Sequence, residues 1–352
     1  MLEELFKPER MLAAMRECEK GVRWKASVQH YEMNTLRWAG SSRREVLNGT
    51  YRSRGFKRFD VVERGKTRHI QSVHISDRAV QKVFCTHMLI PQLYPRLIYD
   101  NSASQKGKGT EFALKRLVEH LRWHYARYGK DGVIVLMDLH GYFDSIPHAG
   151  AIEILTELEE DPRTRRYIAD FINSFPGDTG LGLGSELCQI AAVSYPNEID
   201  KLVKERLRVH CYGRYMDDSY IIHPERAYAE RCLEEIRQAL TARGIALNEK
   251  KTTIRSLHDD FVFLKKRVHI TETGRIVLRI TRANIRRERE RIQQHRKEYD
   301  AGRMPFSAIR QSYQSWRSYA KKYNGYGSVG GMDRYFAGVF ADVLHGTKEE
   351  ST

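Results

Sequence analysis

Two adjacent acids in the middle of an aromatic and apolar segment are the residues of this chain best suited to chemistry. Asp217 and Asp218 follow Tyr215-Met216 and precede a run rich in Tyr and Ile. Apolar residues on both sides of a short polar centre predict a β-hairpin with strands at about 211–215 and 219–223. A tight turn would hold both carboxylates close together, and like charges at that distance favour a bound cation. An ordinary Asp-rich turn is the simpler alternative.

A third acid ends an unbroken apolar run. Residues 133–137 read Val-Ile-Val-Leu-Met, which is typical of a buried central strand, and Asp138 follows directly. A carboxylate at the tip of a buried strand is costly unless a cation pairs with it. Mg²⁺ prefers oxygen ligands and binds through one or two carboxylates plus substrate phosphates. Asp138 and Asp217 together therefore have the ligand type for two magnesium ions, the arrangement that in-line phosphoryl transfer uses.

Three motifs, in this order, resemble motifs A, B and C of a reverse transcriptase. They are Asp138-Leu-His-Gly-Tyr-Phe143-Asp-Ser-Ile-Pro147, Gly182-Leu-Gly184-Ser-Glu-Leu-Cys-Gln189 and Tyr215-Met-Asp-Asp218. The three together are far more specific than any one of them. The resemblance extends to a fingers-like segment, a Gly-rich basic segment, a motif D-like segment and a motif E-like segment, at 63–68, 106–110, 247–252 and 261–264. It covers about residues 50 to 280.

The resemblance implies an α+β fold of the right-hand polymerase type, with an antiparallel palm sheet and a helical thumb. We expect an N-terminal helical extension at 1–50, fingers at 51–130, a palm with part of the fingers at 131–280 that carries motifs A to E, and a helical thumb and tail at 281–352. The N-terminal extension is either a plain packing element or a surface for template or structural RNA.

The catalytic residues that the resemblance implies are Asp138, Asp217, Asp218 and Lys251. The three aspartates would bind two Mg²⁺ ions, which Mn²⁺ could replace, with the Leu139 carbonyl as a further ligand. Lys251 would protonate the departing pyrophosphate as a general acid. Its neighbour Lys250 is a rival for that role, and a solvated lysine pair is the simpler alternative.

A second implied set binds the incoming deoxynucleotide. Lys66 and Arg68 lie on a predicted strand hairpin, where Arg offers bidentate and Lys single contacts to a triphosphate. A solvated hairpin tip is the alternative. Phe143 takes the position of the steric gate, which excludes a 2′-hydroxyl by a clash, although composition alone favours a core aromatic. Leu183 and Gly184 would lie against the nascent base pair.

Motif B departs from the commonest pattern at two positions. Gly182 stands where a proline is usual, and Leu183 where many retroviral and intron enzymes have glutamine. This form resembles that of retron, diversity-generating and phage-defence reverse transcriptases. Loss of the glutamine removes a polar contact near the nascent pair, so we expect loose base selection.

A third implied set contacts primer and template. Lys106 and Lys108 lie in a Gly-rich turn before a helix expected at 110–128, and a loop with solvated lysines is nearly as good an interpretation. The other members are Tyr215, Met216, Phe263 and Leu264. Segments 261–264 and 275–280 are predicted to flank a turn at 271–274, in a hairpin that resembles the primer grip.

Helix boundaries are also predicted around these motifs. Asp144 and Ser145 are expected to cap a helix that runs to about 159, with Pro147 in its first turn. In the thumb, Tyr313, Trp316 and Tyr319 alternate with basic residues, which suits a surface that follows a nucleic-acid backbone. A self-supporting exposed helix is the alternative for this charge pattern.

Composition favours a polyanionic partner. The chain has 352 residues, with Lys+Arg 60 against Asp+Glu 45, a net charge of +15 and a pI of about 9.5. It has neither an apolar run of roughly 20 residues nor a signal-like N-terminus, so we expect a cytoplasmic protein without a membrane partner. Five widely spaced cysteines without a Cys-x-x-Cys pair predict free thiols.

We therefore expect an RNA-directed DNA polymerase that extends a primer 3′-hydroxyl by two-metal phosphoryl transfer. Its partners would be an RNA template, a DNA or RNA primer and dNTPs, with a cognate noncoding RNA and an accessory protein as further candidates. The setting would be a diversity-generating retroelement or anti-phage defence. A non-catalytic RNA-binding protein on the same scaffold and an untemplated nucleotidyltransferase are the alternatives. All three aspartates are present, which disfavours the first.

Overall fold

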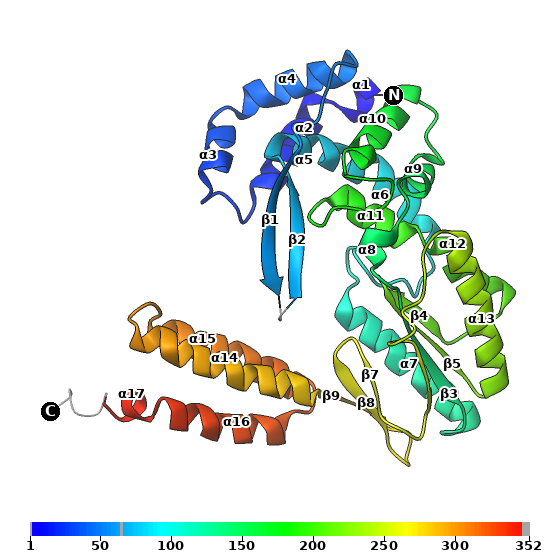
Figure 1. Ribbon diagram of the computed structural model, residues 1–352, viewed down its shortest axis with the longest axis vertical. Helices are drawn as coiled ribbons and strands as arrows, with labels where there is room; N and C mark the ends of the chain where they lie inside the picture. The colour runs from blue at the N-terminus through cyan, green and yellow to red at the C-terminus, as the bar shows by residue number, and fades with distance from the viewer. Residues whose placement is uncertain (1, 64–65, 347–352) are drawn as a thin grey trace. The chain divides into compact units, whose positions relative to one another are not determined.

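The structure is a computed structural model that describes residues 2–63 and 66–346, without the side chains of residues 63, 66, 68 and 345–346. The chain divides into two compact units (Figure 1). The first comprises Met1–Leu117 and Val135–Thr253, and the second comprises Val118–Ile134 and Ile254–Thr352. Helices and antiparallel strands are both present, so the predicted α+β class is confirmed.

The first unit begins with four helices and a long hairpin. The helices are α1 (Leu2–Leu5), α2 (Pro8–Glu19), α3 (Ala26–Met33) and α4 (Thr35–Leu47). Met11 and Met15, four residues apart on one face of α2, are fully buried. Strands β1 (Phe56–Glu63) and β2 (Lys66–Val73) pair antiparallel, with Phe56 opposite Val73. The predicted hairpin is thus confirmed, and its turn, 64–65, lies outside the described residues.

The helical segment after this hairpin consists of three consecutive pieces. They are α5 (Ile75–Phe84), a π-helical turn (Cys85–Leu89) and α6 (Ile90–Leu93), followed by a 3₁₀ turn at Tyr94–Arg96. Helix α7 (Thr110–Tyr128) has the predicted bounds. The unit boundary crosses α7, because Leu117 and Val118 belong to different units.

A four-stranded sheet has the order β4-β5-β3-β6. Its strands are β3 (Val133–Asp138), β4 (Tyr212–Tyr215), β5 (Asp218–His223) and β6 (Thr253–Ser256). The apolar run of β3 is buried, as an inner strand requires. Helix α13 (Arg226–Ala242) contacts β5 through its buried apolar face, and Gly244 follows it at φ +73°.

Two expectations about helix starts are wrong. Asp144 and Ser145 lie inside the short helix α8 (Tyr142–Ser145), and Pro147 is the N-cap of α9 (His148–Thr156). The extended conformation that a proline favours in the residue before it ends α8 at Ile146, so the two acceptor side chains cannot cap the next helix. Pro196 lies between two helices and is the N-cap of the second one. The elements concerned are α11 (Glu186–Ser194), α12 (Asn197–Lys201) and a π-helical turn (Leu202–Arg206). Helix α10 (Pro162–Asn173) lies between α9 and α11 in the chain.

The second unit contains a three-stranded antiparallel sheet of order β7-β8-β9. The strands are β7 (Phe261–Phe263), β8 (Lys266–Ile270) and β9 (Ile276–Ile280). The predicted turn at 271–274 is confirmed, but it joins β8 to β9, so the strand that precedes it is β8 and not 261–264. The turn from β7 to β8 uses Leu264 and Lys265, both at positive φ.

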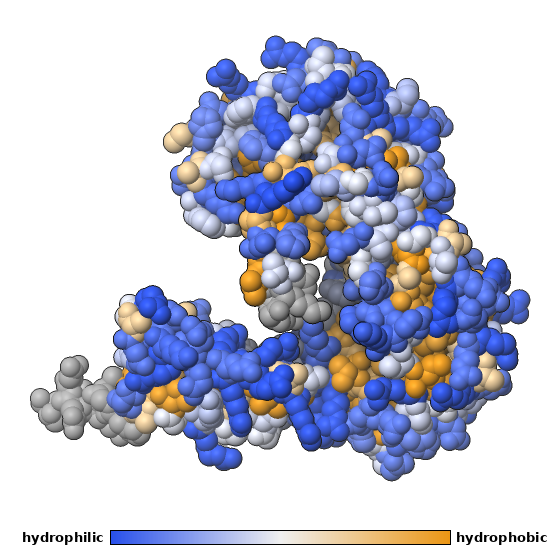
Figure 2. All heavy atoms as spheres, in the orientation of Figure 1, coloured by the Kyte–Doolittle hydropathy of each residue, from blue (hydrophilic) through white to orange (hydrophobic). Residues whose placement is uncertain are grey.

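Helices follow this sheet in the second unit. They are α14 (Arg282–Asp300), α15 (Phe306–Lys322), α16 (Tyr326–Val339) and α17 (Ala341–Gly346). Much of the surface drawn over α14 and α15 in Figure 2 is hydrophilic. Tyr313 and Trp316 are buried, at 4% and 6% exposure, and stack within this unit. They therefore form its core, and of the predicted aromatic surface only Tyr319 is exposed.

Candidate active site

The turn that contains Asp217 is a two-residue hairpin loop. Tyr215 and Asp218 are paired across β4 and β5, so Met216 and Asp217 form the turn itself. Met216 has φ +58°, the left-handed conformation that such loops require and that non-glycine residues seldom adopt. The predicted hairpin is confirmed, and its tight geometry places the two acids next to each other at one end of the sheet.

Asp138 ends β3 beside this turn. The Leu139 N–H donates to the Asp217 carbonyl at 3.2 Å, which ties the end of β3 to the turn. On its other side, the Asn248 N–H donates to the Asp138 carbonyl at 2.7 Å and the His140 N–H to Ala246 at 2.8 Å. These bonds bring together three segments that are far apart in the sequence. The last two of these hydrogen bonds form an isolated antiparallel β-bridge between Leu139 and Leu247. Neither of them involves the Leu139 carbonyl, which was predicted as a metal ligand.

The carboxylates interact electrostatically. Burial, with Asp217 and Asp138 nearby, raises the pKa of Asp218 to about 7, against the opposing effect of Lys251. Lys251 Nζ donates to both carboxylate oxygens of Asp138 at 2.8 Å. This hydrogen bond raises the pKa of Lys251, although its partial burial acts in the opposite direction. The site therefore carries an excess of negative charge that one lysine balances only in part.

The carboxylates of this site suit a magnesium ion whose remaining ligands come from the substrate. Among residues 2–63 and 66–346, no group of three or more His, Cys, Asp or Glu side chains surrounds a single metal position. Mg²⁺ needs only one or two carboxylates when substrate phosphates supply further oxygens. The raised pKa of Asp218 shows that its negative charge is unfavourable without a nearby cation. A cation at Asp138 would have to displace Lys251 from the carboxylate oxygens.

The predicted nucleotide-binding residues belong to the same unit. Phe143 is half-buried with its ring against the edge of Tyr142, and its carbonyl accepts from the Leu181 N–H at 2.7 Å. Motifs A and B are thereby joined through backbone. Leu183 is half-buried, and a Cβ on Gly184 would lie 3.9 Å from atoms of Ile70 and Gln71. The motif B loop therefore lies beside β2.

Two of the predicted nucleotide ligands have no described side chain. The backbones of Lys66 and Arg68 lie in β2, opposite Glu63 and Val61. Their side chains lie outside the described residues, so triphosphate binding by these two cations stays a prediction.

Gly182 explains one departure from the usual motif B. A Cβ at this position would lie 2.1 Å from Cε1 of Phe175. The Phe175 ring in turn stacks on Phe56 at the start of β1, with 4.5 Å between ring centroids. A proline also carries a Cβ, so this packing excludes the proline that resembling enzymes have here.

The predicted primer and template contacts are divided between the units. Lys106 is exposed, whereas Lys108 Nζ donates to the carbonyls of Tyr99 and Asn101 at 2.8 and 3.0 Å. Burial lowers the pKa of Lys108. Tyr215 and Met216 are half-buried at the turn, while Phe263 and Leu264 lie in the second unit, with Phe263 at 3% exposure. Nucleic-acid contact by these six residues stays a prediction.

Sequence reasoning missed a buried ion pair next to the turn. Arg214 on β4 and Asp200 on α12 have side chains that are 3% and 0% exposed, and they lie 2.7 Å apart. Arg214 Nη1 also donates to the Met216 carbonyl at 3.0 Å. A charged residue within the apolar strand Cys211-Tyr-Gly-Arg214 was the available signal, because a buried charge requires a partner.

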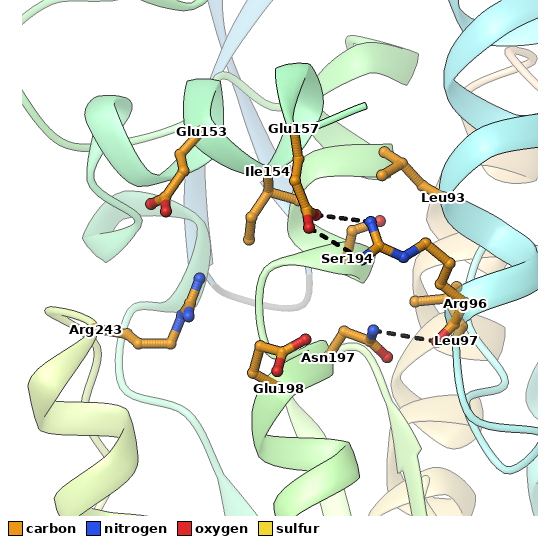
Figure 3. A pocket seen from close by; sticks show the side chains of 10 residues that line it. All are labelled: Leu93, Arg96, Leu97, Glu153, Ile154, Glu157, Ser194, Asn197, Glu198 and Arg243. Atoms are coloured by element: carbon orange, nitrogen blue, oxygen red, sulfur yellow. Dashed lines mark hydrogen bonds and ion pairs between the residues drawn. The ribbon is translucent and has the colours of Figure 1, made fainter. Parts of the chain in front are cut away.

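A polar pocket of about 170 Å³ in the first unit contains none of the predicted site residues (Figure 3). Arg96 and Glu157 face each other across it and form two hydrogen bonds, at 2.7 and 3.0 Å. Ser194 Oγ, Asn197 Oδ1 and Arg243 Nε are buried without a hydrogen-bond partner among the described residues. We assign this pocket no part in the chemistry of the acidic residues.

Carboxylates gathered where β3 meets an antiparallel hairpin, within an α+β fold, define a candidate phosphoryl-transfer centre. Residues 57–295 match the family described as reverse transcriptase (RNA-dependent DNA polymerase), which is more than half of the chain. The chain therefore belongs to the reverse transcriptase family. A comparison with curated proteins gave no match.

Solved telomerase structures are among those similar to this chain. One is apo telomerase from Candida tropicalis truncated from the C-terminal domain, with 14% identity and a TM-score of 0.46, covering 63% of this chain and 54% of that one. Another is telomerase from Candida albicans in complex with a TWJ fragment of telomeric RNA, with 11% identity and a TM-score of 0.48, covering 70% and 50%. This chain thus spans about half the length of either structure. These values are too low to assign it an activity or a partner.

Within residues 2–63 and 66–346, no helix is both long enough and apolar enough to cross a bilayer.

Proposed function

We propose that this protein is an RNA-directed DNA polymerase that extends a primer 3′-hydroxyl with dNTPs. The observation that carries the proposal is the meeting of Asp138, Asp217 and Asp218 at the ends of β3 and the β4–β5 hairpin, close enough for the two other acids to raise the pKa of Asp218. Membership of the reverse transcriptase family supports the same reaction.

Each residue of the site would have its own role in this reaction. Asp138 and Asp217 would hold two divalent cations, with Asp218 and the Leu139 carbonyl as further ligands. When bound, these ions would polarise the attacking hydroxyl and stabilise the leaving pyrophosphate. Lys251 would leave Asp138, because the ions take its place, and its ammonium would become available to protonate the pyrophosphate. Phe143 would exclude ribonucleotides by its ring, and Lys66 and Arg68 would bind the triphosphate.

The biological setting that we propose is a diversity-generating retroelement or anti-phage defence, with low fidelity. Leu183 in place of glutamine supports this, because an apolar side chain cannot hydrogen-bond the nascent pair. A cognate noncoding RNA and an accessory protein would be the additional partners. Neighbouring genes would discriminate the two settings. Fidelity as high as that of retroviral enzymes would contradict the assignment of Leu183.

Primer extension on an RNA template with Mg²⁺ and dNTPs tests the activity. We expect extension by the wild-type protein and its loss in Asp217→Asn, which removes a charge from the metal site. Asp170→Asn is the matched control, since Asp170 is an exposed acid of α10 whose carboxylate pairs only loosely with Arg166, at 3.7 Å. Equal extension by wild type and Asp217→Asn would refute the proposed centre. Extension without a template would favour an untemplated nucleotidyltransferase.

A further inference from the structure

A buried ion pair joins the catalytic turn to helix α12. Arg214 Nε donates to Asp200 Oδ1 at 2.8 Å, and Nη2 donates to Oδ2 at 2.7 Å. This two-point geometry makes guanidinium–carboxylate pairs strong and directional. The Tyr212 hydroxyl donates to the same carboxylate at 2.6 Å. Two side chains of β4 therefore hold Asp200. Burial acts to lower the pKa of Arg214, but the negative charge of Asp200 outweighs this effect and raises it.

The same guanidinium reaches the backbone of the turn. Nη1 donates to the carbonyl of Met216 at 3.0 Å, and Nη2 donates to the carbonyl of Val193 at 2.8 Å. The Met216 carbonyl belongs to the peptide bond that leads into Asp217. Met216 has φ +58°, a conformation that costs a non-glycine residue free energy, so a contact with this peptide group helps to hold the turn in place.

A second contact holds the other side of Asp217. The Leu139 N–H donates to the Asp217 carbonyl at 3.2 Å. The peptide groups before and after Asp217 are thus each held by a hydrogen bond, one from Arg214 and one from the end of β3. Together they fix the backbone dihedrals of Asp217, and hence the direction in which its carboxylate leaves the chain.

We propose that Arg214 is a positioning residue for polymerisation, and that Asp200 orients its guanidinium so that one arm holds the catalytic turn. This inference rests on the proposed function of the turn. Stability alone is a weak reason for a buried ion pair, since well-packed apolar residues often replace one at no loss. The contact with Met216 supplies a reason, because the fixed fork of the guanidinium places Nε and Nη2 on Asp200 and leaves Nη1 for the Met216 carbonyl.

Two variants separate positioning from stability. Arg214→Lys keeps the charge and can pair with Asp200, but its single ammonium cannot also bond Met216 in this geometry. The double variant Arg214→Met with Asp200→Leu removes both charges and restores an apolar interior. For both we expect kcat to fall by about 10- to 100-fold with the KM for dNTP little changed, since misplacement of one catalytic group has an effect of this size. We also expect faster amide hydrogen exchange in peptides that cover 215–222.

Asp77→Asn is the matched control. Asp77 is fully buried in the same unit and accepts hydrogen bonds from the Tyr51 hydroxyl at 2.6 Å and the Arg54 N–H at 2.7 Å. We expect this variant to lower Tm without changing exchange at 215–222 or kcat.

Hydrogen exchange decides the inference independently of activity. If Arg214→Lys exchanges at 215–222 as slowly as wild type, Arg214 does not hold the turn and the inference is overturned, even if the wild-type protein extends no primer. If the double variant has the same kcat and the same Tm as wild type, the Arg214–Asp200 pair has only a structural role. A wild-type protein without extension, but with faster exchange in Arg214→Lys, would contradict the proposed function and leave the positioning of the turn supported.

Discussion

At the scale of single residues, the contact between Lys251 and Asp138 would connect the proposed metal binding to the proposed acid catalysis. Both oxygens of Asp138 accept from the Lys251 ammonium, so lysine and cation compete for one carboxylate. The lysine side chain is 57% exposed, which limits the strength of this pair. Displacement by the cation is therefore feasible, and it would free the ammonium at the moment when substrate arrives.

We expect Lys251→Met to bind Mn²⁺ about three- to tenfold more tightly than wild type, because a weak competitor of under about 1.4 kcal/mol is removed. At the same time kcat should fall by about 100-fold, the typical effect of losing a general acid. Electron paramagnetic resonance of Mn²⁺ and single-turnover extension measure the two effects. Lys250→Met is the control, since Lys250 is an exposed neighbour. Weaker Mn²⁺ binding in Lys251→Met would show that the lysine does not compete with the ion.

Asp218 should make stability depend on pH. Its pKa is about 7 in the native state, raised by burial and by Asp217 and Asp138, against about 3.9 in an unfolded chain. Between these values the native state retains a proton that the unfolded state has lost, so stability falls as pH rises from about 4 to 7.

Asp218→Asn should remove this dependence. Without divalent cations we expect the variant to be more stable than wild type at pH 8 by about 4 kcal/mol, the equivalent of a pKa difference of about three units, and equally stable near pH 4. Thermal unfolding across this pH range measures the difference, and added Mg²⁺ should reduce it by stabilising the wild-type protein. A difference that stays constant from pH 4 to pH 8 would mean that Asp218 titrates normally.

At the scale of elements, the motif B loop is held by ring packing at the start of the β1–β2 hairpin. Gly182 lies against the ring of Phe175, which stacks on Phe56. Because no side chain fits between Gly182 and Phe175, the glycine is a packing requirement at this position. The loop and the hairpin should accordingly be disturbed together.

Gly182→Ala should destabilise the protein by about 1–3 kcal/mol, the usual cost of overpacking a filled site. Gly40→Ala is the control, because Gly40 lies in α4 with nothing within 4 Å of the added Cβ. That substitution should stabilise by roughly 0.5–1 kcal/mol through helix propensity. Differential scanning fluorimetry compares the two. Equal Tm changes of the same sign would show that Phe175 moves aside without cost.

At the scale of the whole molecule, the net charge of +15 is the main physical argument for a nucleic-acid partner. Counterion release makes such binding depend steeply on salt. We expect the affinity for an RNA–DNA primer–template to fall by roughly 10³-fold or more between 50 and 200 mM KCl, as for about six phosphate contacts. Fluorescence anisotropy across this range gives the slope. A flat dependence would mean that the excess cations do not contact phosphates.

The sequence by itself was sufficient for the elements that carry the chemistry. The apolar run before Asp138 and the aromatic flanks of Asp217-Asp218 predicted β3 and the β4–β5 hairpin, because strand burial and turn chemistry are local properties. Local reasoning failed at Asp144 and Ser145, where the effect of Pro147 on the preceding residue ends a helix early. It also missed β8, because this strand mixes Lys, Arg and His with apolar residues and has no clear strand pattern of its own. Its pairing with β7 and β9 is seen only in the folded sheet.

Only the tertiary structure decided which distant groups meet. Lys251 on Asp138, the Leu139 N–H on Asp217 and Asp200 on Arg214 are contacts across separations that no spacing in the sequence specifies. The motifs at 138–147, 182–189 and 215–218 predicted the family and its three aspartates, because a motif depends only on residue type and order. The raised pKa of Asp218, the fixed backbone of Asp217 and the burial of Tyr313 and Trp316 follow from packing, which depends on every segment at once.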